Sequence, residues 1–337
     1  MTSSLINPSA YGIATEERLG LVNGDAFRQF QTANQMQNFL INGAFDFWQR
    51  GTSSPTTGTY GADRFIILSH NTGYAKIDSA LPEGFTSAIQ IGTSVATYAS
   101  VAQRIESANA SLLIGKQITL SFWVKAISGT PDIFVNYYAA TAKDVFTSMT
   151  DFGANNVGAS TTEWKQYSYT TTLTHANVAN GIQVRFGILS AIGTIQITGC
   201  MLNIGSEPAP FSRAGGTIGG ELALCQRYYW RTQTGVNVRL AWGFAYNTSL
   251  CTVGVTYPVT MFRSATPDFG GTAANYAIFY KSDSVSIRIS TMPSLNTHTK
   301  DGMNIISTVT GTPLTAGEGC VLVGTSTAGY LGFDAEL

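Results

Sequence analysis

The sequence predicts an all-β protein made of two antiparallel β-sandwich, jelly-roll-like domains preceded by a short helical N-terminal segment. Charged residues make up only 12% of the 337-residue chain, which contains 35 glycines. Low charge with many glycines and abundant Ser and Thr is typical of short strands joined by many turns. After residue 62, segments of alternating apolar and polar residues follow one another. The chain is also longer than one comfortable hydrophobic core, which favours two domains.

Residues 1–37 differ from the rest of the chain and predict short helices. Asp25 can cap a helix in which Phe27, Phe30 and Met36 fall on a spacing of three positions, among several glutamines. A narrow apolar stripe on so short a helix is not stable alone. It needs a partner, which is either further copies of itself around an axis, another protein, or its own domain. We therefore interpret residues 1–37, with Phe27, Phe30 and Met36, as an attachment or trimerisation segment.

Residues 38–212 predict the first sandwich. About nine short segments with alternating patterning, separated by Gly, Asn, Asp or Pro, describe a two-sheet sandwich or jelly roll. In QITLSFWVKAI the aliphatic and aromatic residues of one face predict core, whereas Trp123 falls on the other face. The core face holds Ile118, Leu120, Phe122 and Val124.

Residues 213–220 predict a linker, because they are rich in glycine and have no strand pattern. Residues 221–337 begin with a short capped turn, ELALCQRYYW, and continue with a second series of alternating segments such as VRLAWGFAY and TVGVTYPVTMF. They predict a second, smaller antiparallel sandwich.

Charge and hydropathy exclude several classes of partner. Lys and Arg number 19 against 20 Asp and Glu, and no basic run is present, so nucleic acid is not expected as a partner. The N-terminus lacks the basic start and apolar stretch of a signal peptide. No window reaches the ~18 apolar residues that a membrane span requires. Membrane insertion and export by the usual route are therefore not expected.

The cysteines and histidines do not indicate a metal or cofactor. The four cysteines are far apart, form no CxxC pair, and are interpreted as buried free thiols rather than disulfides or metal ligands: Cys200, Cys225, Cys251 and Cys320. The three histidines are isolated in Ser, Thr and Asn contexts and are interpreted as loop residues. No cluster of aspartates marks a calcium site.

An Asp-Arg pair in the stretch NFLINGAFDFWQRGTSSPTTGTYGADRF allows two interpretations. Arg50, Asp63 and Arg64 could line a sugar site. Alternatively, Asp63 and Arg64 satisfy turn backbone at the start of the domain, while the aromatic residues of FDFW fill one end of the sandwich. We favour the structural interpretation.

The same stretch resembles a known family. LINGAFDFWQRGTS followed by YGADRF is similar to the start of the carbohydrate-binding-module-like jelly roll of tailed-bacteriophage tail-fibre proteins. IGSEPAPFSRAGG resembles their closing strand and exit loop, ELALCQRYYW the hinge that follows, and VTMFRSATPDF with FDAEL their C-terminal domains. The resemblance covers residues 38–337 in order.

This resemblance implies a virion structural protein that adsorbs to glycans of the host surface as a multivalent homotrimer. It would be assembled in the host cytoplasm and exposed on the particle, with its N-terminus on other tail, baseplate or virion proteins. Two alternatives remain: a head-decoration fibre without a dedicated receptor site, and a glycan depolymerase. A secreted bacterial glycan-binding protein is disfavoured, since an export signal is missing.

Catalysis is not expected from the sequence. Glycoside hydrolysis requires two carboxylates in one cleft, and the acidic residues here are scattered singly, with no spacing that selects a pair. No GxSxG, HExxH, P-loop or EF-hand pattern is present.

Aromatic residues are the candidates for glycan binding, because sugar rings stack on aromatic faces. The candidates in the second domain, which is farthest from the N-terminal attachment segment, are Trp230, Trp242, Tyr246, Tyr257, Tyr276 and Tyr280. Those in the first domain are Trp123 and Tyr138. In VRLAWGFAY, Trp242, Phe244 and Tyr246 share one strand face, which also fits a core or a trimer interface.

Overall fold

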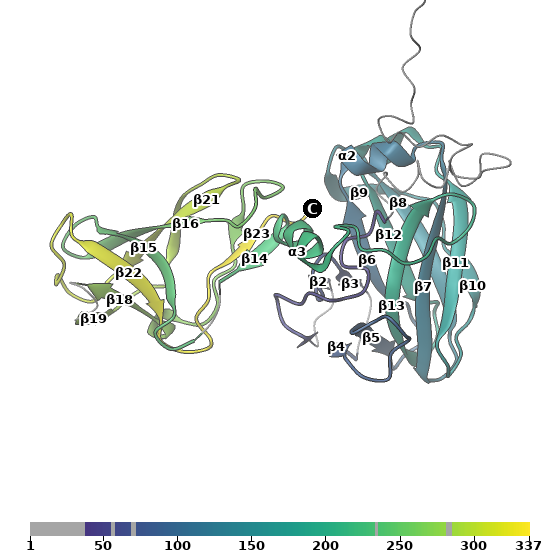
Figure 1. The fold of residues 1–337 in the computed structure, drawn as a ribbon, viewed down its shortest axis with the longest axis horizontal. Coiled ribbons are helices and arrows are strands. Elements are labelled where there is room, and N and C mark those ends of the chain that lie inside the picture. Colours follow the sequence, from purple (N-terminus) through teal and green to yellow (C-terminus); the bar gives the residue numbers. More distant parts are fainter. Residues whose placement is uncertain (1–37, 55–57, 69–71, 233–234, 281–284) are drawn as a thin grey trace, which may run out of the picture.

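The computed structural model describes residues 38–54, 58–68, 72–232, 235–280 and 285–337. The predicted helical segment 1–37, with Phe27, Phe30 and Met36, lies outside the described residues. The described chain forms two all-β domains that lie side by side along the long axis of the molecule (Figure 1).

The first domain is a jelly-roll-like sandwich of two antiparallel sheets. One sheet has the strand order β1 (Ser53–Ser54), β4 (Tyr74–Ile77), β5 (Ala88–Thr93), β13 (Gly193–Ile204), β7 (Gln117–Ser128), β11 (Lys165–Thr172). The other has the order β10 (Asn155–Ala159), β8 (Asp132–Ala142), β12 (Ile182–Ile188), β6 (Ala99–Ile105), β3 (Ile66–Leu68), β2 (Thr59–Tyr60), with β9 (Val145–Asp151) also paired to β8. Neighbours in the sheets are far apart in sequence, as between β13 and β5, so residues from the whole domain build one core.

Alternation along β7 follows the sequence pattern. The predicted core face, Ile118, Leu120, Phe122 and Val124, is fully buried between the sheets, whereas Trp123 lies half-buried on the other face. Thr119 is also buried on that second face, where its hydroxyl oxygen lies 2.8 Å from that of Thr170. The prediction of one core face on this strand is confirmed.

Short helices join and cover the strands. Those of the first domain are α2 (Ser107–Ala110) and the 3-10 turns η2 (Ser111–Leu113) and η3 (Ala176–Asn180); η4 (Ala273–Asn275) belongs to the second. The helix α3 (Ile218–Gln226) begins within the predicted linker, since the side chain of Thr217 accepts a hydrogen bond from the Gly220 N–H and caps it. Glu221 in this helix is fully buried, and its carboxylate accepts from the backbone N–H groups of Asn42 and Gly215. The helix is thereby fixed to the start of the jelly roll.

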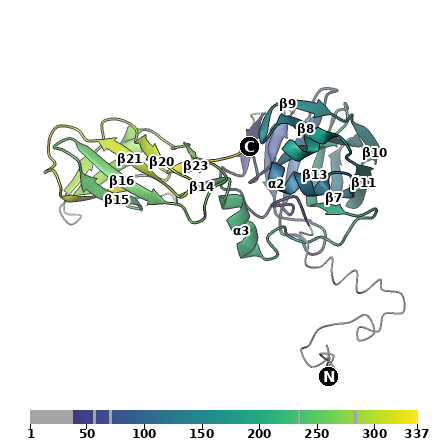
Figure 2. The same cartoon turned by 90° about the horizontal axis from the view of Figure 1, so that it is seen from above.

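The second domain combines a long curved sheet with a short one. The long sheet has the order β19 (Val285–Arg288), β18 (Tyr276–Tyr280), β22 (Gly319–Gly324), β15 (Arg239–Ala245), β16 (Leu250–Thr256), β21 (Gly302–Thr308), β20 (Ser294–His298). The short sheet has the order β14 (Tyr229–Arg231), β23 (Gly332–Asp334), β17 (Thr266–Pro267) and lies at the junction with the jelly roll (Figures 1 and 2). One face of the long sheet encloses the core of this domain.

The expectation of four free thiols is wrong for one pair. Cys251 on β16 and Cys320 on β22 form a disulfide, while Cys200 and Cys225 are free and buried. The two strands flank β15, and their cysteine Cα atoms are 7.0 Å apart, less than the ~9.5 Å that two strand spacings would give in a flat sheet. The sheet is therefore strongly curved at β15, which brings together two cysteines that the sequence separates by 69 positions.

The stretch Asp334–Leu337 leaves the second domain and packs against the first. Leu337 is buried in a small apolar cluster with Ile41 and Phe146 of the jelly roll and Tyr228 of the second domain. The backbone oxygen of Leu337 accepts hydrogen bonds from Tyr60 and Arg104 of the jelly roll. These contacts connect the two domains directly.

Candidate functional site

The candidate site is a groove on the outer face of the long sheet of the second domain. It has a volume of about 580 Å³, within the range of roughly 300–1,000 Å³ that is usual for ligand pockets. Side chains and backbone of four adjacent strands, β15, β16, β20 and β21, line it: Trp242, Gly243, Phe244, Tyr246, Leu250, Cys251, Thr252, Val253, Gly254, Asn296, Asn304 and Ile306. We call it the β16 groove, because β16 is its central strand.

One wall of the β16 groove consists of aromatic side chains. Trp242 and Phe244 occupy alternate positions of β15, and Tyr246 follows directly after it, so that all three point away from the core. Their exposed fractions are 61%, 49% and 68%. The intervening residues Gly243 and Ala245 face inward, and a Cβ atom at Gly243 would lie 1.8 Å from the Thr252 carbonyl oxygen. The tight inner packing of β15 thus holds its aromatic face outward.

The floor of the groove is formed by small residues of β16. Phe244 is paired with Thr252 and Trp242 with Gly254 in the strand register. A Cβ atom added at Gly254 would meet only the Asn304 Oδ1, at 3.5 Å, so this position is open above the sheet. The contrast between large residues on β15 and small ones on β16 creates the hollow.

The opposite wall carries amide groups. Asn304 on β21 is paired with Gly254, and its Nδ2 donates a hydrogen bond of 3.3 Å to Thr297 Oγ1 on β20. Asn296 lies on the same strand as Thr297 and lines the groove. Amide side chains offer both donors and acceptors, and the residues that line the groove include no Asp, Glu, Lys or Arg. The site can therefore stack on flat apolar faces and hydrogen-bond to hydroxyl groups.

The structure brings together two of the aromatic candidates of the second domain and separates the others. Trp242 and Tyr246 lie on the β16 groove. Tyr257, Tyr276 and Tyr280 are buried in the core, where burial raises the pKa of Tyr257 and of Tyr276 to about 12. Since buried rings present no face to a ligand, we do not retain these three tyrosines as site residues.

Trp230 is also placed away from the groove. It is half-buried on β14, and its ring stacks on that of Phe333 with 5.3 Å between the ring centroids. Its position at the short sheet indicates a packing role beside the domain junction.

The two candidates of the jelly roll lie on different sheets. Trp123 is half-buried on β7, and Tyr138 is half-buried on β8, where its hydroxyl accepts a hydrogen bond of 2.9 Å from Asn136. They belong to the two different layers of the sandwich and do not form a common platform.

The binding candidates did not include Phe244 of the aromatic wall or the two asparagines of the opposite wall, Asn296 and Asn304. Alternation in VRLAWGFAY placed Phe244 on the face of Trp242, which was the available signal. No sequence signal pointed to the asparagines, because their strands, β21 and β20, lie beyond β16 from β15, an arrangement that only the sheet order creates.

The Asp-Arg pair belongs to the domain junction. Asp63 is fully buried and accepts hydrogen bonds from the backbone and side-chain nitrogens of Gln49, the latter at 2.6 Å. Burial raises the pKa of Asp63, against the lowering effect of these hydrogen bonds. Arg64 is also buried and is ion-paired with Glu336 of the second domain.

Cation–π contacts add to this junction. The Arg64 guanidinium lies 3.4 Å from the centre of the Tyr228 ring, and that of Arg50 lies 3.5 Å from the centre of the Tyr229 ring. Arg50 is also ion-paired with Asp334 at 2.9 Å. We call the residues in these contacts the junction cluster: Gln49, Arg50, Asp63 and Arg64 from the jelly roll, and Tyr228, Tyr229, Asp334 and Glu336 from the second domain.

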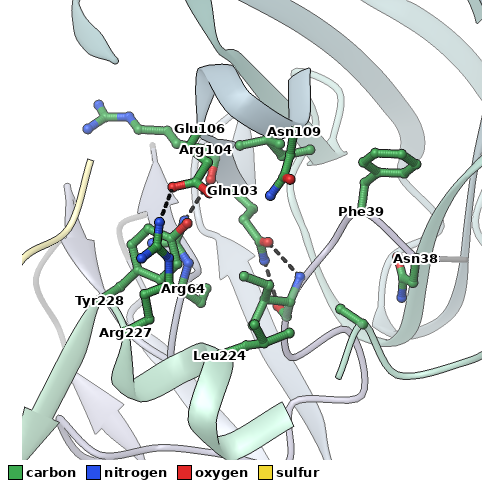
Figure 3. A pocket seen from close by; sticks show the side chains of 13 residues that line it. Asn38, Phe39, Arg64, Gln103, Arg104, Glu106, Asn109, Leu224, Arg227 and Tyr228 are labelled. Atoms are coloured by element: carbon green, nitrogen blue, oxygen red, sulfur yellow. Dashed lines mark hydrogen bonds and ion pairs between the residues drawn. The ribbon is translucent and has the colours of Figure 1, made fainter. Parts of the chain in front are cut away.

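A small cavity beside the junction cluster does not make it a sugar site. Figure 3 shows this cavity, which lies between β6 and α3 and has Arg64, Arg104 and Tyr228 among its lining residues. Its volume of about 50 Å³ is far below the roughly 300 Å³ at which ligand pockets begin. The charged groups are engaged by other parts of the chain, so the structural interpretation of Asp63 and Arg64 fits these contacts.

Comparisons with known proteins were made at three levels. No family model and no curated protein matches the chain. Among solved structures, a protein of Bacteroides thetaiotaomicron described as sugar binding is similar with a TM-score of 0.37 and 13% identity, covering 50% of this chain and 100% of that one. The CBM22-1 xylan-binding domain of Paenibacillus barcinonensis is similar with a TM-score of 0.33 and 9% identity, covering 51% and 99%.

A phage protein is also among these structures. The enzymatically active domain of tailspike protein 4 of bacteriophage CBA120 is similar with a TM-score of 0.33 and 14% identity, covering 50% of this chain and 21% of that one. The chain thus spans about a fifth of that tailspike chain. The description of the fold given above stands on the strand order of the chain itself.

No helix in the part of the chain that the structure describes is long and apolar enough to cross a membrane. Within the same residues, no group of three or more His, Cys, Asp or Glu side chains is placed to hold a metal ion.

Proposed function

We propose that this chain is a bacteriophage virion fibre protein that adsorbs to glycans of the host surface. The observation that carries the proposal is the β16 groove, in which three exposed aromatic side chains in a row face two asparagines across a floor of small residues. Aromatic faces beside amide groups are the usual means by which proteins bind sugar rings. The assignment to a virion rests on the sequence motifs from LINGAFDFWQRG to FDAEL.

The junction cluster is consistent with those motifs. WQRG contributes Gln49 and Arg50, ADRF contributes Asp63 and Arg64, CQRYYW contributes Tyr228 and Tyr229, and FDAEL contributes Asp334 and Glu336. Segments that are far apart in sequence therefore meet in one cluster. This gives the motifs a common structural role, which is to hold the second domain on the jelly roll.

In the proposed assembly the protein is a homotrimer whose residues 1–37 attach it to other virion proteins. Three weak groove sites on one fibre, and several fibres on one particle, would add up to firm adsorption through avidity. Sedimentation or light scattering of the full-length protein should give the mass of a trimer, and deletion of residues 1–37 should weaken it. A monomer at micromolar concentration would contradict this part of the proposal.

The proposal gives the protein no catalytic step. Two of the scattered acidic residues have structural partners: Asp144 accepts from the Ser107 N–H at 2.6 Å, and Glu106 is ion-paired with Arg227 at 2.9 Å. An assay for new reducing ends, run on host surface polysaccharide with the full-length protein, tests this point. Release of sugar above the level of a buffer control would favour a depolymerase instead.

Adsorption of the fluorescent full-length protein to cells of the strain that propagates the virus tests the main proposal. Because the groove aromatics are exposed, the double variant Trp242→Ala/Tyr246→Ala should keep its fold and lose adsorption. The matched control is Trp123→Ala/Tyr138→Ala on the jelly roll, which should adsorb normally.

Two other outcomes of the adsorption experiment would change the proposed location of the glycan site or the proposed role of the protein. Loss of adsorption in the jelly-roll variant alone would move the site to the first domain. Failure of the wild-type protein to adsorb to these cells would favour the head-decoration alternative.

A further inference from the structure

We infer that the β16 groove binds an internal stretch of a linear, uncharged oligosaccharide whose long axis follows β15. This inference rests on the proposed function and names the class of ligand. Three features of the groove carry it: the length of the aromatic row, the space above Gly254 and the absence of charge among the lining side chains.

The aromatic row is longer than one sugar ring. From Trp242 to Tyr246 the chain advances four residues, which is about 14 Å at the rise of an antiparallel strand and corresponds to about two to three pyranose rings. Phe244 lies between them on the same face. A ligand of several consecutive rings can use all three side chains, whereas a single sugar would contact one or two.

The β16 groove is open beside the aromatic row because residue 254 is a glycine. Gly254 is exposed and paired with Trp242 on one side and with Asn304 on the other. Its backbone does not have a positive φ, and a side chain there would meet no backbone atom within 4 Å. Glycine is therefore not required by the strand itself at this position. The open space instead leaves room for a ligand between the aromatic wall and the amide wall.

The composition of the walls selects an uncharged ligand. Hydroxyl groups can be satisfied by Asn296, Asn304 and Thr252, which supply donors and acceptors. An acidic or amino sugar would bring a charge that no lining side chain can pair, and desolvation of an unpaired charge is unfavourable. The groove thus favours hydroxyl-rich neutral rings over uronic or sialic acids.

A pair of glycines provides a matched test. Gly254→Leu places an isobutyl group in the β16 groove, between the aromatic wall and the amide wall. Gly319→Leu places the same group on the same face of the sheet, but on β22, on the other side of the aromatic row, where a Cβ atom meets nothing within 4 Å. Both residues are exposed strand glycines, so both variants should melt like the wild type.

The probes are oligosaccharides from the surface polysaccharide of the propagating strain, released by mild acid and separated by charge and by length. They compete with cells for the fluorescent full-length protein. We expect the uncharged fraction to compete, with affinity rising from one ring to about three. Gly254→Leu should weaken the binding of these oligosaccharides about tenfold or more, Trp242→Ala about tenfold, and Gly319→Leu should bind as the wild type does.

Several results would overturn the inference while leaving adsorption intact. These are competition by the acidic fraction alone, equal competition by mono- and trisaccharides, or wild-type binding by Gly254→Leu. A change in the solution mass of Gly254→Leu, without a change in sugar binding, would show that the groove holds a second copy of the chain. By contrast, loss of adsorption by the wild-type protein itself would be a failure of the proposed function.

Discussion

Asp63 and Arg64 are neighbours in sequence, yet their side chains serve different parts of the molecule. Asp63 turns into the jelly roll and accepts two hydrogen bonds from Gln49. Arg64, whose φ of 72° lies in the left-handed region, reaches the second domain and pairs with Glu336. The unusual backbone conformation of Arg64 permits two consecutive buried charges to point to two different partners.

The buried carboxylate of Asp63 makes stability depend on pH. Burial raises its pKa above the ordinary value of 3.8, so the folded state holds this proton more tightly than the unfolded chain does. The contribution to stability is then fully present below the ordinary pKa and is lost as the pH rises through the raised one. Asp63→Asn should therefore flatten the decline of the free energy of unfolding with rising pH. Urea titrations between about pH 4 and pH 7.5 measure this slope.

The control for this experiment is Glu207→Gln, which changes an exposed carboxylate. The buried Glu221 remains in both variants, and burial raises its pKa too, so part of the slope should persist in Asp63→Asn. An unchanged slope in that variant would contradict the assignment of Asp63.

At the scale of elements, β15 packs on the core with one face and forms a wall of the β16 groove with the other. Its inner residues Gly243 and Ala245 face the core beside the Cys251–Cys320 disulfide, which links the neighbouring strands. Its outer residues form the aromatic wall of the groove. The disulfide therefore stabilises the curvature of the sheet on which the aromatic wall stands.

Removal of the disulfide should destabilise the second domain. The closed loop spans a sequence separation of 69 residues, for which chain entropy alone predicts about 4 kcal/mol. We expect Cys251→Ala/Cys320→Ala to lower the free energy of unfolding by about 2–4 kcal/mol in urea. Alkylation of the unfolded protein without reductant should modify only Cys200 and Cys225. Modification of all four cysteines in that sample would contradict the disulfide.

The sequence pattern predicted the faces of single strands better than it predicted which strands lie together. Alternation in QITLSFWVKAI identified the buried face of β7, because from Ile118 to Val124 every aliphatic residue falls on one side of the strand. The sequence pattern did not distinguish the exposed Tyr246 from the buried Tyr276, since tyrosine is common both in sandwich cores and on their surfaces. The pairing of Cys251 with Cys320 and the approach of Asn304 to Trp242 depend on sheet order and curvature, which local pattern does not encode.

At the scale of the whole molecule, the junction cluster makes the two domains interdependent. A chain ending at Gly215 would lose Glu336, the partner of Arg64, and the helix that carries Glu221. It would also lose Leu337 and thereby expose the apolar partners of Leu337 in the jelly roll, Ile41 and Phe146. A test of the proposed groove site therefore requires point variants of the full chain.

The ion pair between Arg64 and Glu336 should be the most sensitive point of the junction. Arg64→Met leaves the buried Glu336 carboxylate with Arg50 alone, at 3.3 Å, and we expect a loss of about 3 kcal/mol in the free energy of unfolding. The double variant Arg64→Met/Glu336→Gln also removes the carboxylate charge that has lost Arg64, and it should recover most of this loss. A double-mutant cycle in urea measures the coupling. Additive losses would show that the two side chains do not depend on each other.

The insertion of Asp334–Leu337 into the jelly roll has a consequence for evolution by recombination. A gene exchange that replaced residues 221–337 alone would bring a new groove, but it would also replace Tyr228, Asp334 and Glu336. Unless the incoming sequence restored matching charges, the half-buried Arg50 and the buried Arg64 would lose their carboxylate partners. Successful crossovers are therefore expected to fall before Asn38, transferring both domains together, or to join parents that share the junction cluster. Under the proposed function, new binding specificities would otherwise arise by point changes on β15, β16 and β21, which contribute no residue to the junction cluster.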